Sequence, residues 1–204
     1  MYKYPVIVFE GIETSGKSTN INKVSSYLNK INRKFIKIRE PGGTIYSEII
    51  RKLILNKKSK FNFKTDLMLI MASRSENIDK ILKKNLGKKI ILIDRFIDST
   101  IAYQHFGMGI DKNLINKLNN FILDSFKPTF TFINIVNKKN MKIRFNKRNL
   151  LNKYDKFNYS FYRKVQKGFL KLSKKKKNYL VIDSNNNIDE NYQIIIKKVK
   201  RLIS

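Results

Sequence analysis

Pro5-Val-Ile-Val-Phe9 leads through Glu10 into Gly11-Ile-Glu-Thr-Ser-Gly16-Lys17-Ser18, and apolar residues then recur at helical spacing. The first stretch is a short apolar run, which is typical of a strand buried on both faces. The second stretch matches the phosphate-loop pattern G-x-x-x-x-G-K-[ST] and lies between a strand and a helix, the context that this motif requires. The sequence therefore predicts a strand, a phosphate loop and a helix in direct succession.

The residue types of this loop suit a nucleotide polyphosphate. Gly11 and Gly16 let backbone amides curl around an anion, the helix start adds partial positive charge, and Lys17 reaches the terminal phosphates. We expect the hydroxyl of Ser18 to bind Mg²⁺. We expect the phosphates to bind a run of consecutive residues: Gly11, Ile12, Glu13, Thr14, Ser15, Gly16, Lys17, Ser18 and Thr19. The loop alone leaves GTPases, ATPases and kinases open, because it serves each of them.

Strands and helices alternate along the rest of the chain. Apolar runs predict further strands at residues 35–38, 90–93, 129–136 and 179–182. Helical periodicity is present at residues 21–28, 45–53, 67–82, 138–148, 157–172 and 192–202. This alternation predicts an α/β fold of the P-loop NTPase type, with a five-stranded parallel sheet, helices on both faces and ligands at the carboxyl ends of the strands. We expect a single domain over residues 1–204, since the sequence shows no repeat and no linker.

The composition narrows the chemistry. The 204 residues include no cysteine and one histidine, His105, which excludes disulfides, cysteine nucleophiles and thiolate zinc sites. Any metal ion must therefore bind oxygen ligands. The N-terminal residues show neither a signal-peptide pattern nor a membrane-spanning length, so we expect a cytoplasmic enzyme without a membrane partner. The net charge of +29 accompanies abundant Lys, Asn and Ile, which A- and T-rich codons specify, so the charge alone does not indicate a nucleic-acid partner.

Three further segments narrow the choice among phosphate-loop proteins. They are Arg39-Glu-Pro-Gly-Gly-Thr44, Ala72-Ser-Arg74 and Asp94-Arg95-Phe96-Ile-Asp-Ser99-Thr100-Ile-Ala-Tyr103-Gln104. Together with Phe9-Glu10-Gly11 they resemble the thymidylate kinase family of nucleoside monophosphate kinases, in order as far as Thr131. The resemblance implies transfer of the γ-phosphate of ATP to dTMP, which gives dTDP and ADP for dTTP synthesis. It also implies Mg²⁺ bound with ATP, and a homodimer.

The resemblance also assigns roles around the acceptor nucleotide. Arg39 and Arg95 match positions that hold the acceptor phosphate, and a planar guanidinium suits a doubly charged phosphate. Arg74 matches the arginine at the end of the helix that lines the nucleotide pocket. Glu13 matches an acidic position near the acceptor sugar, with a catalytic role, and Asp94 matches a carboxylate that supports Mg²⁺. The positions near the thymine and deoxyribose are Ser99, Thr100, Tyr103 and Gln104.

A polar, basic segment at about residues 144–157 predicts a short lid, for which a plain interhelical loop is the alternative. One branch of the family carries an arginine in the phosphate loop, where this chain has Thr14 and Ser15, so a catalytic cation must come from the lid. The candidates are Arg144, which we also expect to contact ATP, Arg148 and Lys153. Lys153 stands where the family usually has an arginine, and an ammonium keeps the charge but loses the bidentate fork.

Two departures from the family pattern concern the base. Ile70, four residues before Arg74, replaces an aromatic residue that stacks on thymine in many relatives, and Ile135 replaces a usual acidic residue. Ile70 can pack on a base but cannot stack as a ring does. A kinase for another nucleoside monophosphate therefore stays open. A nucleic-acid-stimulated ATPase is a second alternative, but the basic residues are scattered and form no compact aromatic-basic platform, so we expect no specific nucleic-acid partner.

Overall fold

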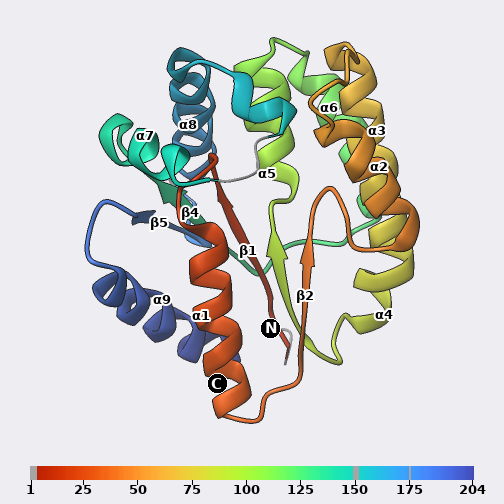
Figure 1. Cartoon of the computed structure of the whole chain (residues 1–204). Coiled ribbons are helices and arrows are strands. Elements are labelled where there is room, and N and C mark those ends of the chain that lie inside the picture. The colour runs from red at the N-terminus through yellow and green to blue at the C-terminus, as the bar shows by residue number, and fades with distance from the viewer. Residues whose placement is uncertain (1–3, 149–151, 175) are drawn as a thin grey trace.

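A parallel sheet forms the centre of the computed structural model, which describes residues 4–148, 152–174 and 176–204 (Figure 1). Within these residues the sheet has five strands in the spatial order β2-β3-β1-β4-β5, and every neighbouring pair is parallel. The strands are β1 (Val6–Gly11), β2 (Phe35–Arg39), β3 (Ile90–Asp94), β4 (Phe130–Ile135) and β5 (Tyr179–Asp183). The predicted five-stranded parallel sheet is confirmed.

Helices follow the strands in the predicted alternation. The α-helices are α1 (Lys17–Lys30), α2 (Ile45–Leu55), α3 (Phe63–Asn77), α4 (Lys83–Asn85), α5 (Ile97–Thr100), α6 (Lys112–Leu123), α7 (Lys138–Asn146), α8 (Tyr159–Ser173) and α9 (Ile188–Ile203). Two π-helical segments, η1 (Ile78–Leu82) and η2 (Ile101–Gly107), continue α3 and α5, and η3 (Lys153–Lys156) is a 3₁₀ turn. The segment from α5 to α6 is helical where the sequence pattern predicted no element.

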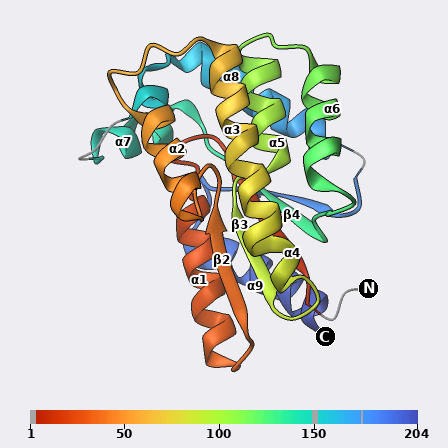
Figure 2. The ribbon, with the colours of Figure 1, turned by 90° about the vertical axis from the view of Figure 1, so that its right-hand side faces the viewer.

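The central strand shows how the two faces are covered. Ile7 and Phe9 of β1 point to one side, where they pack with residues of α1 and α9. Val6 and Val8 point to the other side, toward η1 and the end of α6. Successive side chains of a strand alternate between faces, so an apolar residue at every position means burial on both. Figures 1 and 2 show the helical layers that result.

The carboxyl ends of the strands meet at one edge of the sheet. The phosphate loop follows β1, Arg39 ends β2, Arg95 follows β3 and Ser184 follows β5. Part of the predicted lid lies at the same edge, where Arg144 of α7 contacts the phosphate loop and η3 packs against α2. Residues 149–151, in the middle of the predicted lid segment 144–157, lie outside the described residues.

Candidate active site

The phosphate loop takes a conformation that depends on its two glycines. Gly11 has a φ of 139°, and a β-carbon there would lie 2.3 Å from the carbonyl oxygen of Asn134 in β4. Gly16 has a φ of 88° and caps α1, so the amides of the first turn of α1 stay free for a ligand. Residues with a side chain rarely adopt such angles. The glycines therefore let the loop curl close against β4.

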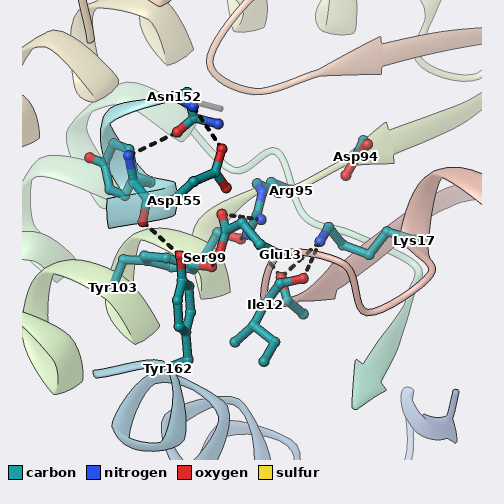
Figure 3. A network of polar contacts seen from close by, with 12 residues as sticks. Ile12, Glu13, Lys17, Asp94, Arg95, Ser99, Tyr103, Asn152, Asp155 and Tyr162 are labelled. Atoms are coloured by element: carbon teal, nitrogen blue, oxygen red, sulfur yellow. Dashed lines mark hydrogen bonds and ion pairs between the residues drawn. The ribbon is translucent and has the colours of Figure 1, made fainter. Parts of the chain in front are cut away.

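Lys17 lies within the curl of the loop. Its Nζ donates to the carbonyl oxygens of Gly11, at 3.0 Å, and Ile12, at 2.7 Å (Figure 3). Burial, together with the charge of Arg95, lowers the pKa of the Lys17 ammonium to about 8. Carbonyl oxygens are weaker partners for an ammonium than phosphate oxygens are. The Lys17 ammonium can therefore exchange these carbonyl oxygens for the phosphate oxygens of a bound nucleotide.

Ser18 and Asp94 offer oxygen ligands beside the loop. The Ser18 hydroxyl lies 3.4 Å from Oδ2 of Asp94, and Oδ1 of Asp94 is buried with no hydrogen-bond partner among the described residues. No cluster of three or more acidic or histidine side chains suited to a metal occurs within the described ranges. Mg²⁺ in phosphoryl-transfer sites takes one or two protein oxygens and fills its shell with phosphate and water. The donor set of Ser18 and Asp94 fits such an ion.

A charged network joins the loop to α5 and η2. Arg95 donates to Oε1 of Glu13 at 2.8 Å and to the carbonyl oxygen of Gly11 at 2.8 Å, and the Tyr103 hydroxyl donates to the other Glu13 oxygen (Figure 3). Burial alone would raise the pKa of Glu13, but Arg95 and Lys17 hold it below the ordinary value. Glu13 therefore stays ionised at neutral pH and orients both Arg95 and Tyr103.

The network borders a pocket of about 550 Å³ at the carboxyl edge of the sheet. Most of the predicted site residues line it: Glu13 to Thr19, Ile70, Arg74, Asp94, Arg95, Ser99, Thr100, Tyr103, Gln104, Arg144 and Arg148. Four predicted site residues, all within the described part of the chain, do not line the pocket: Gly11, Ile12, Arg39 and Lys153. The pocket therefore joins the phosphate loop to the segment that the sequence associates with the acceptor.

The far end of the pocket is fixed by Arg74. Its Nε donates to Glu40 at 2.8 Å, and its two terminal nitrogens donate to Asn119 at 2.6 Å and to Thr100 at 2.9 Å. The Arg74 side chain is 1% exposed, so these bonds tie α3 to α5, to α6 and to the residue that follows β2. Ile70 and Gln104 are also buried there. A base in this end would meet apolar Ile70 and Tyr103 and the polar groups of Thr100 and Gln104.

Arg39 is placed differently from the other predicted acceptor residues. Its guanidinium pairs with Glu48 of α2 at 3.1 Å and its side chain is 55% exposed. Arg51 lines the pocket instead, and its terminal nitrogen donates to the carbonyl oxygen of Pro41 at 2.7 Å. Burial, together with the charge of Arg39, lowers the pKa of Arg51 to about 10. Arg51 was not predicted as a site residue, because it lies nearly two turns into α2, where no sequence motif marks a site.

Glu10 is a second residue whose role the motifs did not reveal. It is fully buried, and it accepts bonds from the amides of Phe96 and Ser99 and from the Ser99 hydroxyl. Burial, with a contribution from the charge of Asp98, raises the pKa of Glu10 to about 7. Ser99 is therefore engaged with Glu10, and Glu10 fixes the start of α5 against β1.

The predicted lid cations make three different contacts. Arg144 bridges the carbonyl oxygens of Thr14, at 3.0 Å, and Ser184, at 2.6 Å, and so ties α7 to the phosphate loop. Arg148 lines the pocket and donates to Asp155 at 2.7 Å. Lys153 pairs with Asp66 of α3 at 2.8 Å, away from the phosphate loop. Two of the three cations therefore lie at the pocket.

No helix in the described part of the chain is long and apolar enough to cross a membrane.

Comparisons with known proteins agree with this geometry. The sequence profile of thymidylate kinase matches residues 9–195. The chain is 39% identical to a thymidylate kinase of Sulfurihydrogenibium sp. (strain YO3AOP1) over 199 residues, with 96% of each chain covered. It is 38% identical to a thymidylate kinase of Mycoplasma capricolum over 205 residues, with 95% of each chain covered.

A solved structure of a thymidylate kinase has the same fold as this chain. The crystal structure of thymidylate kinase from Ehrlichia chaffeensis superposes with a TM-score of 0.78 at 35% identity, covering 97% of this chain and 98% of that one. The likeness in sequence and in structure extends over nearly the whole chain. The family profile, the relatives and the solved structure therefore agree, and the chain belongs to the thymidylate kinase family.

Proposed function

We propose that this chain transfers the γ-phosphate of ATP to dTMP and so forms dTDP and ADP for dTTP synthesis. The observation that carries the proposal is the pocket of about 550 Å³ that runs from the phosphate loop to Arg74 and Gln104. A pocket with a phosphate cradle at one end and a partly apolar, partly polar end suits two nucleotides meeting phosphate to phosphate. The relatives named thymidylate kinase support dTMP as the acceptor.

The chemistry needs little from the protein beyond position and charge. An acceptor phosphate oxygen is ionised at neutral pH, so it attacks the γ-phosphorus in line without a strong general base. Lys17 and Arg95 neutralise the oxygens of the transferred group, and Arg51 and Arg39 attract the acceptor phosphate. Mg²⁺ held at Ser18 and Asp94 would supply further neutralisation of the phosphate oxygens.

Glu13 and Tyr103 orient the acceptor. The Glu13 carboxylate holds Arg95 at 2.8 Å and accepts the Tyr103 hydroxyl, so the phosphate ligand and the sugar-facing ring are fixed by one group. The guanidinium of Arg95 also lies 5.2 Å from the centre of the Tyr103 ring. Positioning of this kind converts a bimolecular encounter into a reaction within one complex.

Arg144 and Arg148 are the cations that we assign to the lid. Arg144 already contacts the backbone of Thr14, and Arg148 lines the same pocket. Both bring positive charge to the ATP side of the site, where this chain has Thr14 and Ser15 and no arginine in the phosphate loop. The lid would also exclude water, which suppresses hydrolysis of ATP.

We also propose a cytoplasmic homodimer. Ile45, Ile49 and Leu53 recur every fourth residue on α2 and are 81%, 51% and 46% exposed, with Tyr46 beside them at 68%. Met68 of the adjoining α3 is 47% exposed. Figure 2 shows α2 and α3 side by side on one flank of the molecule. A second copy would remove this apolar surface from water by a symmetric contact.

The test of the proposed function follows diphosphate product rather than ADP. Purified protein with ATP and Mg²⁺ is offered dTMP, dUMP, dCMP, UMP and GMP in turn. Rapid formation of dTDP supports the proposal, and faster transfer to another monophosphate assigns a different acceptor. ATP hydrolysis that needs single-stranded nucleic acid and no acceptor would contradict it.

A further inference from the structure

Lys153 hydrogen-bonds to Asp66 of α3 and to the segment that precedes this helix. Its Nζ lies 2.8 Å and 3.1 Å from the two carboxylate oxygens of Asp66 and 3.1 Å from the carbonyl oxygen of Phe61. An ammonium has three donors, and these contacts use all of them. The Asp66 side chain is fully buried and that of Lys153 is 14% exposed. A buried pair of this kind costs much more to break than an ion pair on the surface.

Asp66 belongs to the helix that forms one wall of the acceptor pocket. Asp66, Ile70 and Arg74 recur every fourth residue of α3, so they share one face of the helix. Ile70 and Arg74 line the pocket one and two turns beyond Asp66. The contact with Lys153 therefore joins the 3₁₀ turn η3 to the acceptor wall.

The same turn fixes Arg148. Asn152 caps the turn, and the side chain of Asp155 accepts from the amide of Asn152 at 2.7 Å (Figure 3). The same carboxylate accepts from Arg148 at 2.7 Å. Tyr154, between Lys153 and Asp155, is buried against Tyr103 with ring centres 5.9 Å apart. The position of η3 therefore determines where Arg148 and Tyr154 lie in the pocket.

We propose that Lys153 and Asp66 form a latch that docks η3 on α3 and thereby positions Arg148 for phosphoryl transfer. Lys153 is then a positioning residue and not a ligand of the transferred phosphate. The reason is geometric, since its donors are used by Asp66 and Phe61. Lys153 also does not line the pocket, whereas its neighbours Asn152 and Tyr154 do. The inference rests on the proposed transfer to dTMP.

A double-mutant cycle tests the latch. The variants are Asp66→Asn, Lys153→Met and the double substitution, with kcat for dTDP formation measured in each. Each single change should lower kcat by about 10-fold, because either one undocks η3. The double variant should lose no more than a single variant, because the latch can be broken only once. Lys153→Arg keeps the charge and should retain most of the wild-type kcat.

A second readout separates positioning from general destabilisation. ATP hydrolysis without dTMP should rise relative to transfer in the latch variants, because an undocked turn admits water to the site. Lys64→Met removes an exposed lysine from the first turn of α3 and should leave kcat and the hydrolysis ratio unchanged. Thermal unfolding of each variant shows that the protein assayed is folded.

Two results would overturn the latch. If Lys153 contacts phosphate directly, Asp66→Asn frees the ammonium and kcat stays at or above the wild-type level, while Lys153→Met alone loses activity. If the losses of the two single variants multiply in the double variant, the residues act independently. Absence of dTDP formation by the wild-type chain would instead contradict the proposed function, so the two failures are distinguishable.

Discussion

Glu10 and Glu13 show how position decides the chemistry of a carboxylate. They are separated by two residues in the sequence, and burial acts to raise the pKa of both. Arg95 and Lys17 nevertheless lower the pKa of Glu13, whereas burial and the charge of Asp98 raise the pKa of Glu10. Glu13 can therefore hold a cation in the pocket, and Glu10 serves to fix the chain below it. The difference follows from the neighbouring charges and not from the residue type.

Glu10 should make stability depend on pH. The folded chain keeps a proton on Glu10 up to about pH 7, whereas the unfolded carboxyl releases it near 4.5, so this group lowers stability as pH rises between those values. Glu10→Gln keeps acceptor and donor groups but removes the titration. The melting temperature of the variant relative to wild type should therefore be higher at about pH 8 than at about pH 5. A difference that is the same at both pH values contradicts the assignment.

Ile70 should limit the affinity for the acceptor base. It is 9% exposed at the pocket end that holds Arg74, and an isoleucine lacks the quadrupole of a ring. Ile70→Phe should lower KM for dTMP by about 2- to 10-fold, the equivalent of a ring-stacking contribution of about 0.5–1.5 kcal/mol. KM for ATP should not change, and Ile70→Leu provides the volume-matched control. An unchanged or higher KM for dTMP in the phenylalanine variant would place the base elsewhere.

At the scale of elements, strands were easier to predict from the sequence than π-helices. The run Ile90–Ile93 has four apolar residues in a row, which a buried parallel strand requires, and the structure has β3 at Ile90–Asp94. The segment Ile101–Gly107 is π-helical, so its turns do not follow the 3.6-residue period that the sequence analysis relied on. Tyr103 and Gln104 were found only because they lie in a recognisable motif.

The sequence also did not predict which charged residues pair with one another. Lys153 stands at a family position for a lid cation, but its partner Asp66 lies 87 residues away in the chain. Arg39 pairs with Glu48 across the turn into α2, and Arg51 takes a place at the pocket. Such pairings depend on how α3 and α2 pack, which periodicity alone does not determine.

The first turn of α3 should contribute measurably to stability. The Asn62 side chain caps this helix by accepting from the amide of Thr65 at 2.9 Å. Asn62→Ala should lower the free energy of unfolding by about 1 kcal/mol, measured by urea denaturation with an unchanged slope. Asn62→Ser retains a capping oxygen and should lose much less. Equal losses in the two variants would mean that the cap is not the stabilising contact.

For the whole molecule, the exposed face of α2 predicts the state of association. Ile49 lies in the middle of this face and is 51% exposed. Ile49→Glu would place a charge in an apolar contact, which is costly to bury unpaired, so the protein should shift toward the mass of one 24.2 kDa chain. Lys197→Glu, which adds a carboxylate on α9, should leave the mass unchanged. Sedimentation velocity measures the mass of the wild type and of both variants. A monomeric wild type would refute the proposed dimer.

The central claim is that one pocket brings the γ-phosphate of ATP on the phosphate loop to the phosphate of dTMP. The most direct measurement is the rate of dTDP formation with Mg²⁺-ATP and dTMP, for the wild-type chain and for Lys17→Ala, with circular dichroism confirming that both are folded. The account predicts rapid dTDP formation by the wild type and a loss of at least about 100-fold in the variant, because Lys17 neutralises the transferred group. Near-normal turnover by folded Lys17→Ala, or no dTDP from the wild type, would contradict it.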